Sequence, residues 1–187
     1  MPKTVLVPIA DGSEELEAVA IIDVLRRAEA DVTVASVTGS RQIIASRGMV
    51  LVADALLADC LDQAYDLIAL PGGIPGADHL RDSAELIALL KRQVETGRLY
   101  GAICASPAVV LEHHGLLNGR QATAHPYIAA ELSNQDAVNQ SVVVDGNCVT
   151  SRGAGTAVDF ALALVELLFD KEKRIEVATG LALPTPE

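Results

Sequence analysis

Short apolar runs alternate with longer segments of helical periodicity, and this alternation is the main structural signal along the chain. Runs of strand length lie at 3–10, 31–37, 43–44, 49–52, 66–70, 99–103, 141–144 and 147–150. Those at 66–70 and 99–103 are continuously apolar, which is typical of strands buried on both faces of a parallel sheet. The last two runs flank Asp145-Gly146 and predict a hairpin. The two short runs at 43–44 and 49–52 predict an antiparallel pair.

Helical segments follow most of these runs. Apolar residues spaced by three and four positions predict helices at 14–30, 83–96, 107–113, 157–169 and 171–179. Ser13 suits the N-terminus of the first helix, and Gly97 suits the end of the second. The alternation predicts a doubly wound, mostly parallel α/β sheet sandwiched by helices, with residues 1–187 as one domain. Ligands of such folds gather at the carboxyl ends of the strands, where the loops 11–17, 71–78 and 104–107 would meet.

Composition and charge narrow the possible functions. The 187 residues carry a net charge of −11, and only 3% are aromatic, so stable nucleic-acid binding is not expected. No apolar run approaches the roughly 20 residues of a membrane-spanning helix. Acidic residues follow the first strand too early for a signal peptide, and the three cysteines have no paired spacing. We therefore expect a cytoplasmic protein that is not bound to membranes.

The segment Gly101 to Pro107, GAICASP, is the strongest local signal for chemistry. A strand leads directly into a helix with Cys104 at the junction. A nucleophile elbow needs small residues two places before and after the nucleophile, and these are Ala102 and Ser106. The dipole of the following helix would favour the thiolate. The alternative is a buried cysteine that acts as a small hydrophobe, which is our interpretation for Cys60 and Cys148.

Three acids, Glu14, Glu15 and Glu17, follow the first strand at the same edge of the sheet as Cys104. A carboxyl group beside the sulfur would have a raised pKa and could donate a hydrogen bond or move protons. Acids in a first helical turn also complement the helix dipole, and this alternative suits Glu14 and Glu15. Glu17 lies one turn further and could point back toward the sheet edge.

Other candidate groups give weaker signals. The glycine-rich segment 72–76 lacks the lysine of a phosphate loop, so it is either an oxyanion-binding turn or a plain strand exit. His125 could act as acid, base or orienting group, or could be purely structural. No metal site is expected, because the chain has neither a CxxC nor an HExxH motif.

The order of the motifs GSEELE, ASRG, LPGGIPGA, GAICASPA, HP and TSRGAGTA resembles the ThiJ/PfpI superfamily, and within it the branch of parkinsonism-associated deglycases. The resemblance runs from Val5 to about Val177. It implies a flavodoxin-like fold, a homodimer and no cofactor. The protease-like branch has histidine directly after the cysteine, where this chain has Ala105, and related amidotransferases use a late H-x-E pair that this chain lacks.

The resemblance also implies roles for individual residues. Cys104 matches the reactive cysteine, Glu17 the protonated carboxyl group beside it, and His125 the nearby histidine. Two matched positions supply backbone N–H donors, Gly73 and Ala105. Three matched positions lie on the dimer face: Arg47, Asp23 and Arg27. From the residues alone, Arg47 is also a potential anion ligand.

Two kinds of function follow from the resemblance. The first is a glyoxalase or deglycase that acts on methylglyoxal or glyoxal, or on their adducts with protein or nucleotides. In it, Cys104 would be the nucleophile and Glu17 the proton shuttle. The second is a redox-sensing, chaperone-like stress-response protein in which Cys104 is oxidised to the sulfinate. Both use one site, and the sequence does not separate them.

Overall fold

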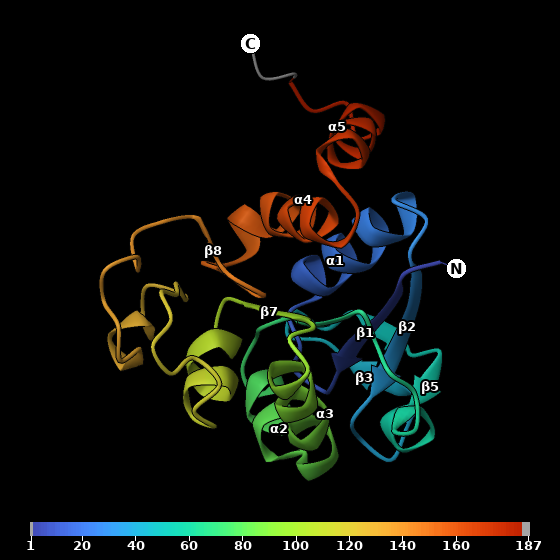
Figure 1. Ribbon diagram of the computed structural model, residues 1–187. Helices are drawn as coiled ribbons and strands as arrows, with labels where there is room; N and C mark the ends of the chain where they lie inside the picture. Colours follow the sequence, from blue (N-terminus) through green and yellow to red (C-terminus); the bar gives the residue numbers. More distant parts are fainter. Residues whose placement is uncertain (1, 185–187) are drawn as a thin grey trace.

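The computed structural model describes residues 2–184 and is built around a seven-stranded sheet (Figure 1). The strand order is β5-β2-β1-β6-β7-β9-β8, and every pairing except β8 with β9 is parallel. The strands are β1 (Thr4–Ile9), β2 (Asp31–Ser36), β5 (Ala55–Leu56), β6 (Leu67–Leu70), β7 (Leu99–Ile103), β8 (Val142–Asp145) and β9 (Cys148–Ser151). A separate antiparallel pair consists of β3 (Gln42–Ile44) and β4 (Val50–Val52).

Helices cover both faces of the sheet (Figure 1). The helices are α1 (Glu15–Arg27), α2 (Gly76–Asp82), α3 (Ala84–Glu95), α4 (Ala157–Leu168) and α5 (Lys171–Gly180). Helices α1 and α4 pack together on one face, and α5 packs on α4. The α2–α3 pair covers the other face. The fold is therefore the predicted doubly wound α/β sandwich. Among residues 2–184, no helix is both long enough and apolar enough to cross a membrane.

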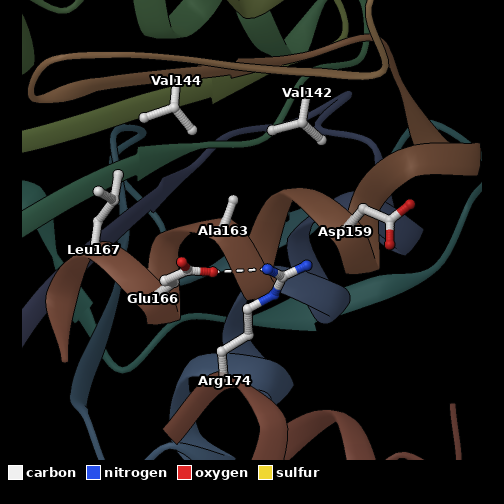
Figure 2. Close-up of a pocket in the computed structure, with 7 residues that line it drawn as sticks. All are labelled: Val142, Val144, Asp159, Ala163, Glu166, Leu167 and Arg174. Carbon is white, nitrogen blue, oxygen red and sulfur yellow. Dashed lines mark hydrogen bonds and ion pairs between the residues drawn. The ribbon is translucent and has the colours of Figure 1, made fainter. Parts of the chain in front are cut away.

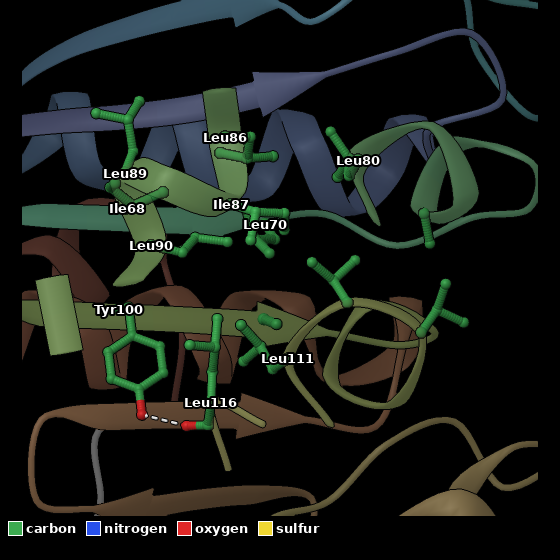
Figure 3. Close-up of a cluster of buried hydrophobic side chains, with 14 of the residues drawn as sticks. Ile68, Leu70, Leu80, Leu86, Ile87, Leu89, Leu90, Tyr100, Leu111 and Leu116 are labelled. Atoms are coloured by element: carbon green, nitrogen blue, oxygen red, sulfur yellow. Dashed lines mark hydrogen bonds between the residues drawn. The ribbon is translucent and has the colours of Figure 1, made fainter. Parts of the chain in front are cut away.

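Alternating side chains of the central strands fill two separate aliphatic clusters. In β1, Val5 and Val7 belong to the cluster that includes α1 and α4, whereas Leu6 joins the cluster under α3. This is the two-residue period of a strand that is buried on both sides. Tyr100 is the largest fully buried side chain, and its hydroxyl donates to the carbonyl of Leu116 at 2.8 Å (Figure 3). A chain with few aromatic residues thus builds both cores from Val, Leu, Ile and Ala.

Two local expectations were wrong. The segment 71–78 is not wholly a loop, because α2 begins at Gly76. The first helix is capped by Glu14, whose carboxylate accepts from the N–H of Glu17 at 2.8 Å, while the Ser13 hydroxyl accepts from Ala10. The helix predicted at 107–113 is confirmed, as a π-helix at Pro107–Glu112. The β8–β9 hairpin and the β3–β4 pair are confirmed.

Candidate functional site

Cys104 occupies a strained turn directly after β7. Its φ angle is +65°, in the left-handed region that costs a residue with a Cβ about 1–3 kcal/mol. Two backbone hydrogen bonds hold the turn: the Cys104 N–H donates to Ser151 at 2.9 Å, and the His125 N–H donates to the Cys104 carbonyl at 2.8 Å. This is the geometry of a nucleophile elbow, with the side chain projected from the carboxyl edge of the sheet.

Glu17 lies in the first turn of α1 and is fully buried. Its Oε2 accepts a hydrogen bond from the N–H of Gly72 at 2.8 Å. Its Oε1 has no partner, and it is the only such buried side-chain atom among residues 2–184. An unpaired carboxylate oxygen would be costly at this depth, so the surroundings favour a protonated carboxyl group that can donate to a neighbour.

The sulfur of Cys104 is that neighbour. A Cβ placed on Gly72 would lie 2.6 Å from the Cys104 Cβ and 2.9 Å from Glu17 Oε2. A Cβ placed on Gly153 would lie 3.9 Å from both Cys104 Sγ and Glu17 Oε1, and 3.3 Å from His125 Cδ2. The absence of side chains at these two glycines leaves room for the three predicted residues to meet.

Burial raises the pKa of Glu17 to about 7, and the charge of Glu14 raises it further, against the Gly72 N–H that lowers it. Since the ordinary value is 4.5, a large share of the Glu17 side chains is protonated near neutral pH. The predicted raised pKa is confirmed, with desolvation as its main cause.

Burial also raises the pKa of Cys104, to about 12, and the negative charge of the neighbouring Glu17 raises it further. The backbone N–H groups of Gly73 and Ala105 lower it. Once Glu17 is protonated, its charge is gone and its O–H can donate to the sulfur, so the thiolate is then stabilised. The predicted thiolate stabilisation therefore depends on the Glu17 proton, and the six-residue π-helix after Ser106 does not outweigh burial.

Gly73 and Ala105 place their amides beside the sulfur, as the resemblance implied. Gly73 has a φ angle of +89°, and a Cβ there would overlap the carbonyl of Gly12. The turn after β6 therefore requires glycine to approach the loop after β1. Two amides converging near one reactive atom form a typical oxyanion-binding arrangement.

His125 stands at the open side of the site. It is partly exposed, and the N–H of Tyr127 donates to its Nδ1 at 3.4 Å, which places the proton of the neutral ring on Nε2. The Tyr127 ring lies 5.0 Å from the His125 ring and is 96% exposed. The His125 ring thus borders both the site and the solvent.

The other three predicted residues lie outside this cluster. Asp23 and Arg27 form an exposed ion pair of 2.6 Å on α1. Arg47 is exposed in the turn between β3 and β4, where its N–H donates to Glu15 at 2.8 Å. Sequence reasoning missed Gly153, although it lies in the motif TSRGAGTA, because the missing Cβ has a meaning only once its neighbours are known.

A separate hollow of about 430 Å³ lies between β8, α4 and α5, away from Cys104 (Figure 2). The Glu166–Arg174 ion pair of 2.7 Å crosses it. Its lining contains no cysteine, serine, threonine or histidine. Within residues 2–184, no three His, Cys, Asp or Glu side chains lie close enough together to hold a metal ion.

Known proteins are similar to this chain over almost its whole length. The chain is 53% identical to Protein DJ-1 homolog B of Arabidopsis thaliana over 93% of its length, but it spans only 40% of that relative. It is 35% identical to the Caenorhabditis elegans protein named glutathione-independent glyoxalase DJR-1.2, covering 96% of this chain and 95% of that one.

Among solved structures, the oxidized form of Toxoplasma gondii DJ-1 superposes with a TM-score of 0.95 at 46% identity, covering 98% of this chain and 100% of the other. The sequence pattern of the DJ-1/PfpI family matches residues 3–167, which include β1, the elbow and most of α4. The chain therefore belongs to the DJ-1/PfpI family.

Proposed function

We propose that the chain is a cofactor-free glyoxalase and deglycase that acts on methylglyoxal or glyoxal and on their adducts with protein or nucleotides. The observation that carries the proposal is the buried Glu17 carboxyl group, with one oxygen unpartnered among residues 2–184, beside the sulfur of Cys104. Rearranging a 2-oxoaldehyde requires a nucleophile and a group that both gives and takes a proton. The name of the C. elegans relative supports the same chemistry.

In the first step Cys104 forms a bond to the substrate and Glu17 supplies a proton. The Cys104 thiolate adds to the aldehyde carbon, and the Glu17 carboxyl group gives its proton to the aldehyde oxygen, which forms a hemithioacetal. Glu17 is then a carboxylate, and its pKa of about 7 makes it a base at neutral pH.

The second step moves hydrogen within the substrate. Glu17 removes the hydrogen from the former aldehyde carbon, and a proton returned to the ketone carbon gives the thioester of a hydroxy acid. The aldehyde carbon is oxidised and the ketone carbon is reduced, so no external oxidant is needed. Water then cleaves the thioester, and methylglyoxal leaves as lactate. The N–H groups of Gly73 and Ala105 stabilise the oxyanion, and His125 relays protons to solvent.

Lactate formation from methylglyoxal tests the proposal. We expect wild type to form lactate, and we expect the Cys104→Ala and Glu17→Ala variants each to lose at least about 100-fold in rate, because each removes a group that the reaction needs. Cys148→Ala serves as the matched control, since its thiol is buried in β9 away from the site. Equal lactate yields in wild type and the two site variants would refute the proposal.

A second function, redox sensing with chaperone-like action, is favoured by the same unpaired Glu17 oxygen. Two equivalents of peroxide convert the thiol to a sulfinic acid and release two waters. The Glu17 O–H would then donate to a sulfinate oxygen. Intact mass after mild peroxide should show two added oxygens in wild type and none at this position in Cys104→Ala. A wild-type protein oxidised first at Cys60 or Cys148 would contradict this function.

We also propose that the chain forms a homodimer through the exposed side of α1 and the β3–β4 pair. Large apolar side chains are exposed there: Leu16, Val19, Ile44, Met49, Val50 and Val52. The N–H of Gly12 donates to Ile44 at 2.8 Å and that of Ser46 to Ser13, so the pair lies against the start of α1. Asp23 and Arg27 continue the same side of the helix, and Arg47 lies in the adjoining turn.

Light scattering tests the dimer. Wild type should elute with twice the chain mass, whereas Val52→Asp, which places a charge on the patch, should shift the protein toward the monomer. Val144→Asp is the control, because Val144 is 50% exposed on β8, far from this surface. A monomeric wild type would contradict the proposal.

The compartment proposed for this protein is the cytoplasm, where its three unpaired thiols would stay reduced.

A further inference from the structure

Ser106 has a hydroxyl group that the elbow does not require. The turn needs only a small residue at this position, and glycine or alanine would suffice. Ser106 is fully buried, and its Oγ donates to the carbonyl of Pro71 at 2.6 Å, across 35 positions of sequence. Ser106 is also the N-cap residue of the following π-helix, yet among the described residues its side chain caps nothing there. The hydroxyl therefore serves the contact with Pro71 rather than its own helix.

This contact lies just beyond the point where strands β6 and β7 stop pairing. The parallel ladder between β6 and β7 ends with Leu70 opposite Ala102. Pro71 begins the turn after β6, and Cys104 to Ser106 form the elbow after β7. The Ser106–Pro71 hydrogen bond links these two segments beyond the last paired residues.

The turn that Ser106 holds carries two groups of the site. The N–H of Gly72 donates to Glu17 Oε2 at 2.8 Å, and the carbonyl of Gly72 accepts from Glu14 at 2.9 Å. The N–H of Gly73 lies beside the sulfur of Cys104 and lowers the pKa of its thiol. Moving Pro71 away from the elbow would therefore change the placement of the carboxyl group and of the amide relative to the sulfur.

We infer that Ser106 is a positioning residue, whose buried hydroxyl fixes the Pro71–Gly73 turn against the elbow and so sets the contacts of Cys104 with the Gly73 amide and with Glu17. The inference rests on the proposed function only in taking Cys104 as the reactive thiol. It makes no use of a particular aldehyde substrate.

The rate of alkylation of Cys104 by iodoacetamide, measured against pH, tests this role without any turnover assay. In Ser106→Ala and Ser106→Gly the Gly73 amide is less well held, so we expect the midpoint to move up by roughly half to one pH unit and the rate at pH 7 to fall about 3- to 10-fold. Ser106→Thr keeps the hydroxyl and should keep the wild-type midpoint.

Ser36→Ala is the matched control, since Ser36 is a buried serine whose Oγ lies 2.8 Å from Thr38 Oγ1, two strands away from β6. A merely structural role predicts lower melting temperatures in both the 106 and the 36 variants, with every midpoint unchanged. That result overturns the inference, as does a folded Ser106→Thr whose midpoint moves as far as that of Ser106→Ala. If wild type forms no lactate but the midpoints move as expected, the proposed function fails and the positioning role stands.

Discussion

Two cysteines lie at neighbouring strands: Cys148 is buried, and Cys104, which we propose as the reactive one, is only partly buried. Burial raises the pKa of both Cys104 and Cys148 to about 12. Cys148 lies within β9, in the cluster under α3, and the neighbours acting on its pKa are Tyr100, Arg120 and Asp145. Cys104 lies one residue past β7 beside Glu17, whose own pKa is about 7.

The two thiols differ in their ionisable neighbour as well as in their burial, since Cys148 is buried and Cys104 is partly exposed. Near neutral pH, Glu17 can change its protonation state and thereby change both the charge and the hydrogen bonding at the sulfur. Tyr100 cannot do this for Cys148, because burial raises its pKa still further above the ordinary value of 10. We propose that Cys104 is the reactive thiol because the titratable Glu17 carboxyl group and a partial opening lie beside it.

Thiol labelling should separate the two cysteines by the largest margin. In the native protein, iodoacetamide should modify Cys104 at least about 100-fold faster than Cys148, because Cys148 reacts only after local or global opening. Mass mapping of the labelled peptides over time gives both rates. Cys104→Ala should leave the native protein almost unlabelled, and equal rates at the two positions would contradict the comparison.

Adding a side chain at Gly72 should have the second largest effect, because it would disturb the elbow that holds Cys104. An added methyl group would lie 2.6 Å from the Cys104 Cβ and 2.8 Å from the backbone oxygen of Ile103, and neither atom can move without shifting the elbow. Gly72→Ala should lower the free energy of unfolding by about 1–3 kcal/mol and slow the labelling of Cys104. Urea denaturation and labelling rates measure the two effects.

Gly155→Ala is the control for that substitution, because a Cβ at Gly155 meets nothing within 4 Å and its backbone φ is not positive. It should change neither the stability nor the labelling rate by a measurable amount. A Gly72→Ala protein with wild-type stability would show that the elbow is less tightly packed than its geometry indicates.

Glu17 should make stability depend on pH in a direction opposite to that of most carboxyl groups. Its pKa rises from 4.5 to about 7 on folding, so the folded state holds the proton more tightly, and stability falls as pH rises through this range. Between pH 5.5 and 8 the loss due to Glu17 should be about 2 kcal/mol. Urea denaturation at both pH values should show this slope in wild type.

The Glu17→Gln variant keeps the shape of the side chain but cannot titrate. It should lack that part of the pH dependence, while Glu15→Gln should retain it, because hydrogen bonds from Ser46 and the backbone lower the pKa of Glu15 instead. An unchanged slope in Glu17→Gln would mean that another group causes the pH dependence.

Periodicity predicted most of the fold, because the helices and strands of this sheet bury regular apolar faces. It failed at α2, whose segment GADHLRD begins with glycine and has few apolar positions, so its contacts with the π-helix outweigh weak local preference. Glu17 and Cys104 were predicted because each follows a strand whose end is visible in the sequence. The role of Gly153 was not, since it depends on contacts between segments about 30 to 140 positions apart.

The smallest expected effect comes from removing the inert cysteine. Cys148→Ala leaves a small cavity in the cluster around Tyr100 and should lower the free energy of unfolding by about 1 kcal/mol. The pH midpoint for alkylation of Cys104 should stay at its wild-type value, because Cys148 packs under α3 while Cys104 packs toward α1 and α4. A shifted midpoint would show that the sheet transmits changes between the two thiols. The difference in reactivity between the two thiols would then come from coupled packing rather than from Glu17, which lies beside Cys104 only.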